Sequence, residues 1–334
     1  MSRITILGGG SWGTGLAVIL AGSRRKHEIR LWVRASSLAD SIERDRENKK
    51  YLPGIPIPPC VNASSDLENS LREAHIVVNA IPSAHTRSIF ALALPHVSRD
   101  AAFVSATKGL EPATHLRMSE VLSQVINARF LPQIAVLSGP SFAAEAAQGH
   151  PTAVVLASED ASLGAFLQEE FSSPTFRLYT NDDVLGVELA GAMKNVMAIA
   201  AGACQGLALG ANSLAALITR GLAEMSRLAV ALGGKPETLS GLAGMGDLIL
   251  TCYGSQSRNR RVGFELGQGR SLQQILADMT MVAEGVGTTA ALLALAKENH
   301  LELPITQQVH SILHLGNSPR EAIRAIMERP LKRE

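Results

Sequence analysis

Residues Ile4-Thr5-Ile6-Leu7 run directly into Gly8-Gly9-Gly10-Ser11-Trp12-Gly13, and this stretch decides the fold. The apolar, β-branched run predicts a strand, and the small and apolar residues of 14–20 predict a helix. Gly8, Gly10 and Gly13 have the G-x-G-x-x-G spacing, which serves a tight turn, close approach to a pyrophosphate, and close helix packing, in that order. The N–H groups at the start of the helix would face the phosphates. The stretch therefore predicts a dinucleotide-binding turn.

Length and composition limit the classes of protein that fit. A chain of 334 residues usually exceeds one hydrophobic core, so we expect two domains. The formal net charge of +1 gives no electrostatic footprint for nucleic acid or an anionic membrane. Cys60, Cys204 and Cys252 are far apart and odd in number, which favours neither a disulfide framework nor a metal site. A reducing cytosol fits this cysteine usage best.

Targeting and membrane signals are weak in this sequence. Arg3 lies inside the first predicted strand, and no leader with a cleavage site is evident. The most apolar region, 187–218, is interrupted by charged and amide residues and is too polar for a membrane span. We therefore expect a cytoplasmic protein with no integral membrane segment and no nucleic-acid partner.

Arg34 ends the second predicted strand, 28–34, which alternates polar and apolar residues. In dinucleotide-binding folds the residue at this place meets the adenosine ribose. An acid there binds the 2′-hydroxyl, whereas an arginine accommodates a 2′-phosphate. Arg34 is thus a candidate for the 2′-phosphate of NADP(H), and a solvated strand end is the alternative.

Further strand signals follow in the first half of the chain. Residues 40–59 are charged and then rich in proline, which predicts a helix followed by an irregular loop. Buried parallel strands are expected in four apolar runs, 75–81, 101–106, 134–137 and 153–156. Their carboxyl ends, where ligands bind in such sheets, carry polar residues at 82–83, 107–109 and 138–141.

The pattern changes from about Asp182 onward to long helical stretches without a convincing strand. We predict an α/β, Rossmann-like dinucleotide-binding domain over 1–180 and an all-helical substrate and catalytic domain over 181–334. The crevice between two such domains is the default substrate site.

Lys194 is the one cation in the predicted apolar helix 188–200. Its helical neighbours at three and four residues are Ala190, Gly191, Met197 and Ala198. These surroundings should desolvate the ammonium and lower its pKa, as acid–base catalysis near neutral pH requires. The alternatives are a lysine that snorkels and one that pairs with a carboxylate.

Three other places carry candidate polar groups. Asp247 follows the flexible Gly244-Met245-Gly246, and the stretch 257–261 is the densest basic cluster of the second half. Arginine forks suit phosphate oxygens, although a charge run is more often a solvated turn. Lys108, at a predicted strand end, is a further candidate for binding an anion.

Taken together, these motifs resemble those of bacterial NAD(P)-dependent sn-glycerol-3-phosphate dehydrogenases over nearly the whole chain and in the family's order. The matching stretches are 8–14, 107–111, 138–143, 188–195, 246–248, 256–261 and 282–285. The resemblance implies reversible conversion of dihydroxyacetone phosphate and NAD(P)H to sn-glycerol 3-phosphate, a precursor of phospholipids. NADP(H) or NAD(H) would be the cofactor, no metal is implied, and a homodimer is a candidate assembly.

The resemblance also assigns roles to residues of this sequence. Lys194 would donate and accept the proton, with Lys108, Asn195, Asp247 and Thr251 around the reacting carbonyl. The substrate, chiefly its phosphate, would be held by Gly139, Ser141, Ser257, Arg258 and Asn259, with Lys108, Lys194 and Asp247 also in contact. The cofactor would contact Ser11, Trp12, Arg34, Lys108, Ala143, Arg258, Val282 and Glu284, besides Gly8, Gly10 and Gly13.

Two departures from the family pattern and two alternative functions accompany this interpretation. Ala144 replaces a lysine found in many relatives, and Gly287 replaces a frequent arginine.

The first alternative function is a dehydrogenase of another small hydroxy acid, of the 3-hydroxyacid or 6-phosphogluconate type. The second is a dinucleotide-binding sensor without turnover, which would be expected to lose both Lys194 and Asp247.

Overall fold

The computed structural model describes residues 2–331 and 333, and the chain forms two compact units. The first contains the chain up to Glu111 and Leu116–Glu188, and the second contains Pro112–His115 and the chain from Leu189.

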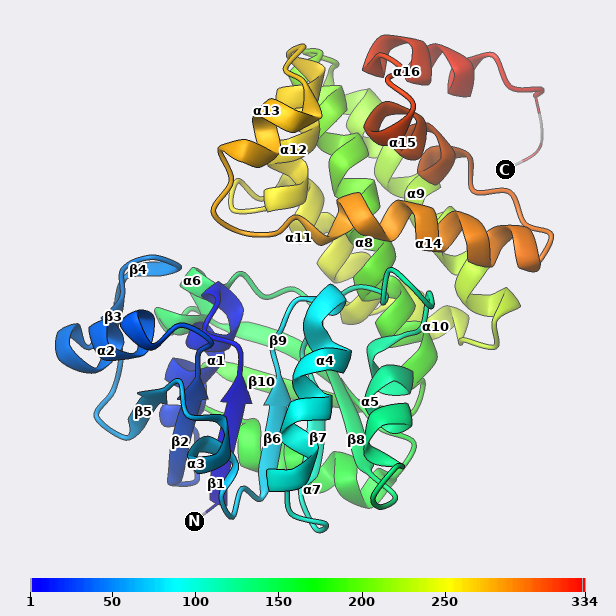
Figure 1. Cartoon of the computed structure of the whole chain (residues 1–334). Helices are drawn as coiled ribbons and strands as arrows, with labels where there is room; N and C mark the ends of the chain where they lie inside the picture. Colours follow the sequence, from blue (N-terminus) through cyan, green and yellow to red (C-terminus); the bar gives the residue numbers. More distant parts are fainter. Residues whose placement is uncertain (1, 332, 334) are drawn as a thin grey trace. The chain divides into compact units, whose positions relative to one another are not determined.

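An eight-stranded sheet organises the first unit (Figure 1). Its order is β10-β9-β8-β7-β6-β1-β2-β5. The strands are β1 (Ser2–Leu7), β2 (His27–Trp32), β5 (Val61–Ser64), β6 (Ile76–Asn79), β7 (Ala102–Ser105), β8 (Gln133–Ser138), β9 (Thr152–Ala157) and β10 (Phe176–Asn181). β1 lies between β2 and β6, so the strand order reverses at the glycine turn that follows it. Such a reversal is where open α/β sheets bind ligands.

The expectation that every strand runs parallel is wrong at β9. β8 and β9 pair antiparallel, and β10 pairs parallel to β9. The connection holds only the five-residue helix α6 (Ala143–Ala147). Such a helix is about 7.5 Å long, against about 20 Å for a six-residue strand, so it does not carry the chain back along the sheet.

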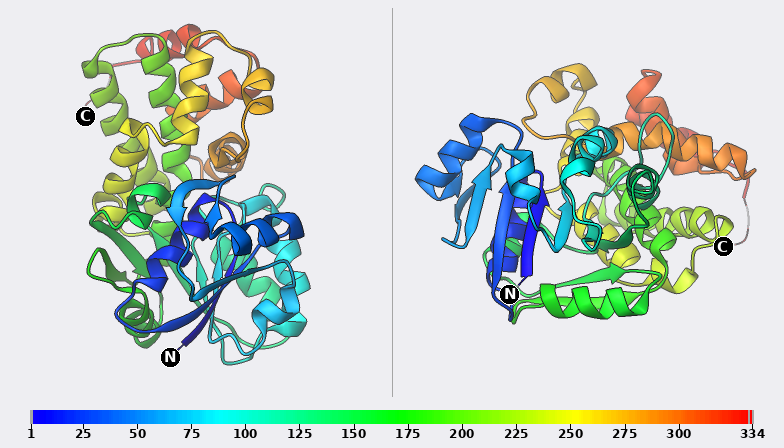
Figure 2. Two further views of the ribbon diagram at one scale, coloured as in Figure 1. Left: turned by 90° about the vertical axis from the view of Figure 1, so that its left-hand side faces the viewer. Right: turned by 60° about the horizontal axis from the view of Figure 1, so that its bottom comes forward.

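Helices cover both faces of the sheet (Figures 1 and 2). One face packs on α1 (Ser11–Ala21), α2 (Ser36–Asp45) and α7 (Ala161–Phe171), and the other on α3 (Leu67–Leu71), α4 (Ser83–Ala93) and α5 (Met118–Ile126). Strand residues alternate between the two cores: Ile4 and Ile6 join the first and Leu7 the second. A single 3₁₀ turn, η1 (Leu94–His96), follows α4.

The proline-rich part of 40–59 is more regular than expected. After α2 the chain forms a small antiparallel pair, β3 (Glu47–Asn48) and β4 (Leu52–Pro56), which is separate from the main sheet. Proline is tolerated in such a two-stranded pair because each strand has an unpaired edge. The predicted irregular loop is therefore wrong, and β4 packs against α1 and α6.

The second unit is helical, and the described residues after Asn181 include no strand. A π-helical turn, η2 (Leu242–Gly246), leads directly into α11. The helices are α8 (Val184–Gly206), which begins in the first unit, α9 (Ala211–Ala231), α10 (Pro236–Ser240), α11 (Asp247–Tyr253), α12 (Arg258–Gly267), α13 (Leu272–Ala277), α14 (Glu284–Glu298), α15 (Pro304–His314) and α16 (Pro319–Met327). The predicted order, a Rossmann-like region followed by a helical one, is confirmed.

Among the described residues, α8 alone has the length and apolar composition of a membrane-spanning helix. Its most apolar window is 89% buried inside the protein. The core helix of a globular protein passes the same test of length and composition, so this helix is weak evidence for a membrane segment.

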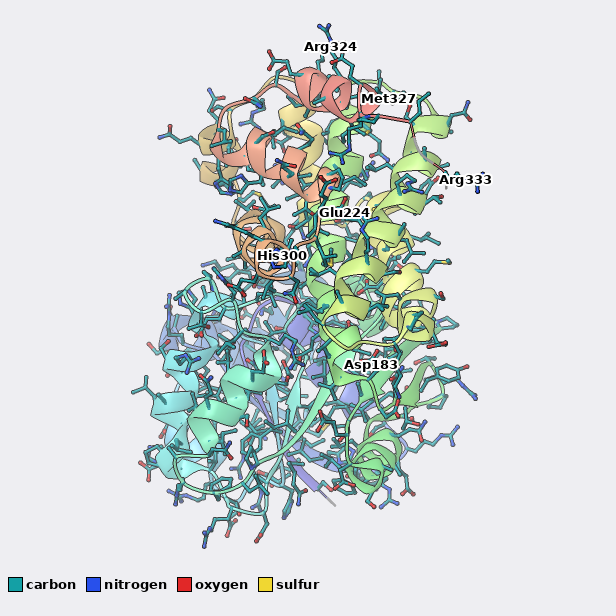
Figure 3. The ribbon with its side chains drawn as sticks, turned by 90° about the vertical axis from the view of Figure 1, so that its right-hand side faces the viewer. Asp183, Glu224, His300, Arg324, Met327 and Arg333 are labelled. Atoms are coloured by element: carbon teal, nitrogen blue, oxygen red, sulfur yellow. The ribbon has the colours of Figure 1, made fainter. Side chains whose placement is uncertain are left out.

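Glu224 on α9 caps a helix that begins far along the chain (Figure 3). Its buried carboxylate accepts hydrogen bonds from Ile305 N (2.8 Å), Thr306 N (2.9 Å) and Thr306 Oγ1 (2.7 Å) at the start of α15. Burial raises the pKa of this carboxyl group, and the three donors oppose the shift.

Candidate active site

Two of the three predicted positions of the glycine turn, Gly8 and Gly13, require glycine for steric reasons within the chain itself. Gly8 has φ +120°, and a Cβ there would lie 2.6 Å from Ala80 O. A Cβ on Gly13 would lie 1.9 Å from Gly8 O, so α1 packs closely on the turn. Around Gly10 nothing lies within 4 Å of a Cβ, which leaves open space where a pyrophosphate would approach.

Other predicted cofactor residues surround this turn. Ser11 and Trp12 form the first turn of α1, and the buried Trp12 Nε1 has no hydrogen-bond partner in the described structure. Ala143 begins α6 and packs on α1, where a Cβ on Gly15 would lie 3.2 Å from Ala143 O. Arg34 is exposed, two residues after β2 and just before α2.

Lys108, Gly139 and Ser141 meet at the carboxyl ends of β7 and β8. Lys108 Nζ donates to Gly139 O at 2.8 Å, and Ser141 Oγ donates to the same carbonyl at 3.0 Å. Gly139 has φ +124°, and a Cβ there would lie 3.0 Å from the backbone of Val154. Glycine is thus required at residue 139, whose carbonyl accepts from both the Lys108 ammonium and the Ser141 hydroxyl.

In the second unit, Lys194 forms a buried ion pair. Its Nζ lies 2.5 Å from Asp247 Oδ1 and 2.8 Å from Thr251 Oγ1, with 8% of the lysine side chain and 1% of the aspartate side chain exposed. Thr251 Oγ1 also donates to Asp247 O at 2.6 Å. The expectation of an ammonium with only apolar neighbours is wrong. Those neighbours lie on α8, whereas the carboxylate comes from α11.

Asn195 and Asn259 form a second buried pair. Asn259 Nδ2 donates to Asn195 Oδ1 at 2.9 Å, while Asn259 Oδ1 accepts from Gly285 N at 3.0 Å. Asn195 Nδ2 in turn donates to Gly191 O at 3.3 Å. This chain of amides joins α8, α12 and the start of α14, so both asparagines have fixed orientations.

Arg258 opens α12, with Ser257 as its cap. Ser257 Oγ accepts from Arg260 N at 3.2 Å, and Arg258 Nη1 donates to Val282 O at 2.7 Å. Burial lowers the pKa of the Arg258 guanidinium, and the charge of Glu284 opposes the shift. The alternative of a freely solvated basic turn is therefore wrong for Arg258.

The helices that carry Lys194 and Arg258 are in backbone contact. A Cβ on Gly202 of α8 would lie 1.9 Å from Arg260 O, and one on Gly263 of α12 would lie 1.9 Å from Ile199 O. Gly206 and Gly267 repeat this reciprocal contact one turn further along. Sequence reasoning missed these four glycines, although each pair is spaced G-x-x-x-G, the pattern of close helix packing.

The comparisons with known proteins agree with this arrangement. Residues 3–164 match the model of the N-terminal region of NAD-dependent glycerol-3-phosphate dehydrogenase, and residues 183–324 match that of its C-terminal region. The chain belongs to this family. The prediction of the family from the sequence motifs is thereby confirmed, as is that of an oxidoreductase using NAD(P).

Individual relatives are similar over their full length. A glycerol-3-phosphate dehydrogenase (NAD(P)+) of Koribacter versatilis is 54% identical over 99% of this chain and 98% of its own. One of Acidobacterium capsulatum is 53% identical over 99% of each chain. The crystal structure of the family member from Coxiella burnetii, 41% identical, superposes with a TM-score of 0.93 over 98% of this chain and 99% of that chain.

Proposed function

We propose that this member of the glycerol-3-phosphate dehydrogenase family interconverts dihydroxyacetone phosphate and sn-glycerol 3-phosphate, with Lys194 as the proton donor and acceptor. The observation that supports this role is the buried ion pair of Lys194 with Asp247, 2.5 Å apart. A carbonyl oxygen that accepts a hydride on its carbon gains negative charge, and an adjacent ammonium both stabilises that charge and delivers the proton.

Two observations support binding of the dinucleotide by the first unit. Gly10 leaves open space beside the start of α1, and Trp12 Nε1 is a buried donor without a protein partner. When bound, NAD(P)H supplies the hydride. We assign its binding to residues 8–13, Arg34, Lys108, Ala143, Arg258, Val282 and Glu284.

Asp247 and Thr251 would position the ammonium. Together they direct two of its three N–H bonds, so Nζ needs little reorganisation when it transfers a proton. In the reverse direction the neutral amine would take the proton of the substrate hydroxyl. Lys108 and Asn195 would complete the polar surroundings of the carbonyl.

The substrate phosphate would be bound chiefly by Arg258, with Ser257 and Asn259 beside it and Gly139 and Ser141 as further contacts. Ser257 Oγ accepts from Arg260 N as a cap, so its hydroxyl hydrogen remains a donor. Asn259 uses one N–H of its amide on Asn195 and keeps a second. A substrate this small has its phosphate as the main source of binding energy.

The wider assignments are also proposals. We assign dinucleotide binding to residues 1–180, substrate binding and catalysis to 181–334, and the product to phospholipid synthesis. We propose a cytoplasmic location, which the three cysteines without a disulfide support, and a homodimer as the assembly. Light scattering on the purified protein tests the dimer.

One assay tests the function. Nicotinamide absorbance is followed with dihydroxyacetone phosphate, with unphosphorylated dihydroxyacetone, and in the oxidative direction with 3-hydroxyacids and 6-phosphogluconate, each with both cofactors. We expect turnover of dihydroxyacetone phosphate and very poor use of dihydroxyacetone. Equal rates on these two ketones would contradict the phosphate site. Turnover of a hydroxy acid alone would favour the other dehydrogenase class, and binding without turnover would favour a sensor.

A further inference from the structure

Asn48, on the short strand β3, has a fully buried side chain that contacts the glycine turn. Its Nδ2 donates to Gly9 O at 2.9 Å and to Thr14 Oγ1 at 2.8 Å, and Thr14 is itself 1% exposed. The hairpin β3–β4 thus hydrogen-bonds to the glycine turn through the amide of Asn48.

The orientation of this amide is determined by its partners. Tyr51 N lies 3.2 Å from Asn48 Oδ1, and a backbone N–H can only donate. Gly9 O can only accept, so Nδ2 must face it. The two ends of the side chain are therefore not interchangeable, and Asn48 acts as a donor toward the turn.

Gly9 and Gly10 lack the Cβ atoms that would otherwise restrict the peptide between them. In a trans peptide the C=O and the N–H point in opposite directions, and the described chain has no cis peptide. Holding Gly9 O toward Asn48 therefore turns the N–H of Gly10 away from Asn48. The Thr14 N to Gly10 O bond of 3.0 Å anchors the next carbonyl.

We propose that Asn48 is a positioning residue for the dinucleotide, because it fixes the Gly9–Gly10 peptide in the orientation that presents the N–H of Gly10 to the pyrophosphate. This inference rests on the proposed binding of the cofactor at the glycine turn. The Asn48 side chain hydrogen-bonds Gly9, Thr14 and Tyr51, none of which is assigned to the substrate, so its loss should affect cofactor affinity and leave the affinity for the ketone unchanged.

Asn48→Asp is the most informative variant, because it preserves the shape of the side chain and the acceptor for Tyr51 N, whereas its ionised carboxylate cannot donate to Gly9 O. The dissociation constant for NADPH is measured by nucleotide fluorescence on the full chain without substrate. We expect it to rise about 10-fold or more, since a buried carbonyl is left unsatisfied beside a new negative charge. KM for dihydroxyacetone phosphate and kcat at saturating NADPH should stay within about twofold of the parent.

Glu47→Ala is the matched control on the same strand. It removes the 2.8 Å bond from Gly54 N to Glu47 Oε1, which weakens the hairpin without touching the turn. We expect a lower melting temperature with an unchanged dissociation constant. If Glu47→Ala weakened NADPH binding as much as Asn48→Asp, hairpin stability and not the amide would be responsible, and the proposal would fail.

If Asn48→Asp does not fold, Thr14→Val tests the positioning role of Asn48 instead. It removes the second acceptor of Nδ2 and keeps the contact with Gly9 O, so a rise of about threefold in the dissociation constant is expected, and no rise contradicts the proposal. Unchanged NADPH binding in folded Asn48→Asp also overturns it. Failure of the proposed site itself is distinguishable, because Gly10→Val would then bind NADPH as tightly as the parent does.

Discussion

The glycine turn and the Lys194 cluster are built in opposite ways. The turn is made by consecutive residues, 8–13, whose roles follow from backbone geometry at each position. The cluster joins Lys194 to residues 53 and 57 positions away, on a different helix. The residues of the turn are therefore contiguous in sequence, although Asn48 and Ala80 also contact it, whereas the cluster is assembled only where helices of the second unit pack. Substitutions should separate the two accordingly.

The largest effect is expected for Lys194→Met, which keeps the length of the side chain and removes its charge. We expect kcat to fall by about 10²–10⁴-fold, the usual contribution of a positioned general acid, with NADPH binding unchanged. Steady-state kinetics and a fluorescence titration measure the two quantities. A kcat near that of the parent would mean that the proton comes from another group, with Lys108 as the next candidate.

The ion pair adds a stability effect to this variant. Removing the ammonium leaves a buried carboxylate beside a thioether, which should cost about 3 kcal/mol of unfolding free energy. The double variant Lys194→Met/Asp247→Asn should recover most of the loss in melting temperature without recovering kcat. Equal melting temperatures of the single variant and the parent would show that the pair contributes no net stability.

Arg258→Ala should raise KM for dihydroxyacetone phosphate by about 10–100-fold, because a charge-assisted contact to phosphate is lost from a partly desolvated place. KM for unphosphorylated dihydroxyacetone should change little. Initial-rate measurements with both ketones test this, and parallel changes for the two would place Arg258 away from the phosphate.

Gly263→Ala tests the close packing of α8, which carries Lys194, against α12, which carries Arg258. The new Cβ would meet a backbone carbonyl 1.9 Å away, so α8 and α12 must move apart, at a cost of about 1–3 kcal/mol. Gly287→Ala, in open space on α14, is the matched control and should be neutral or slightly stabilising. The melting temperatures of both variants are compared, and kcat is measured for Gly263→Ala. A loss of stability in Gly263→Ala alone assigns the effect to the contact between α8 and α12 and not to alanine as such.

The smallest effect is expected for Arg34, in the first unit. No acid neighbours Arg34 in sequence, so we expect NADPH to be accepted and preferred, and Arg34→Asp should shift the kcat/KM ratio about 10-fold toward NADH. Paired kinetics with the two cofactors measure the shift. An unmoved ratio would mean that Arg34 is only a solvated strand end.

The contrast between the two sites also explains what the sequence could predict. The glycine turn, six of the eight strands of the main sheet and the helical second half follow from local patterns. β5 and β10 are not among the predicted strands. Lys194 was singled out from its own helix, but its partner Asp247 lies 53 residues on, and helical periodicity carries no information across that distance. The direction of β9, the β3–β4 hairpin and the amide of Asn48 likewise depend on tertiary packing.

The cap of α15 has a consequence for shortened forms of this chain. Glu224 lies on α9, yet the groups that satisfy its carboxylate belong to Ile305 and Thr306. A chain that stopped before residue 304, by proteolysis or by a premature stop codon, would lose those three donors together with α15, which packs on α9, and would expose this carboxylate to solvent. The final helices are thus structural partners of the middle of the chain, and nicking between α14 and α15 should expose α9 to further digestion.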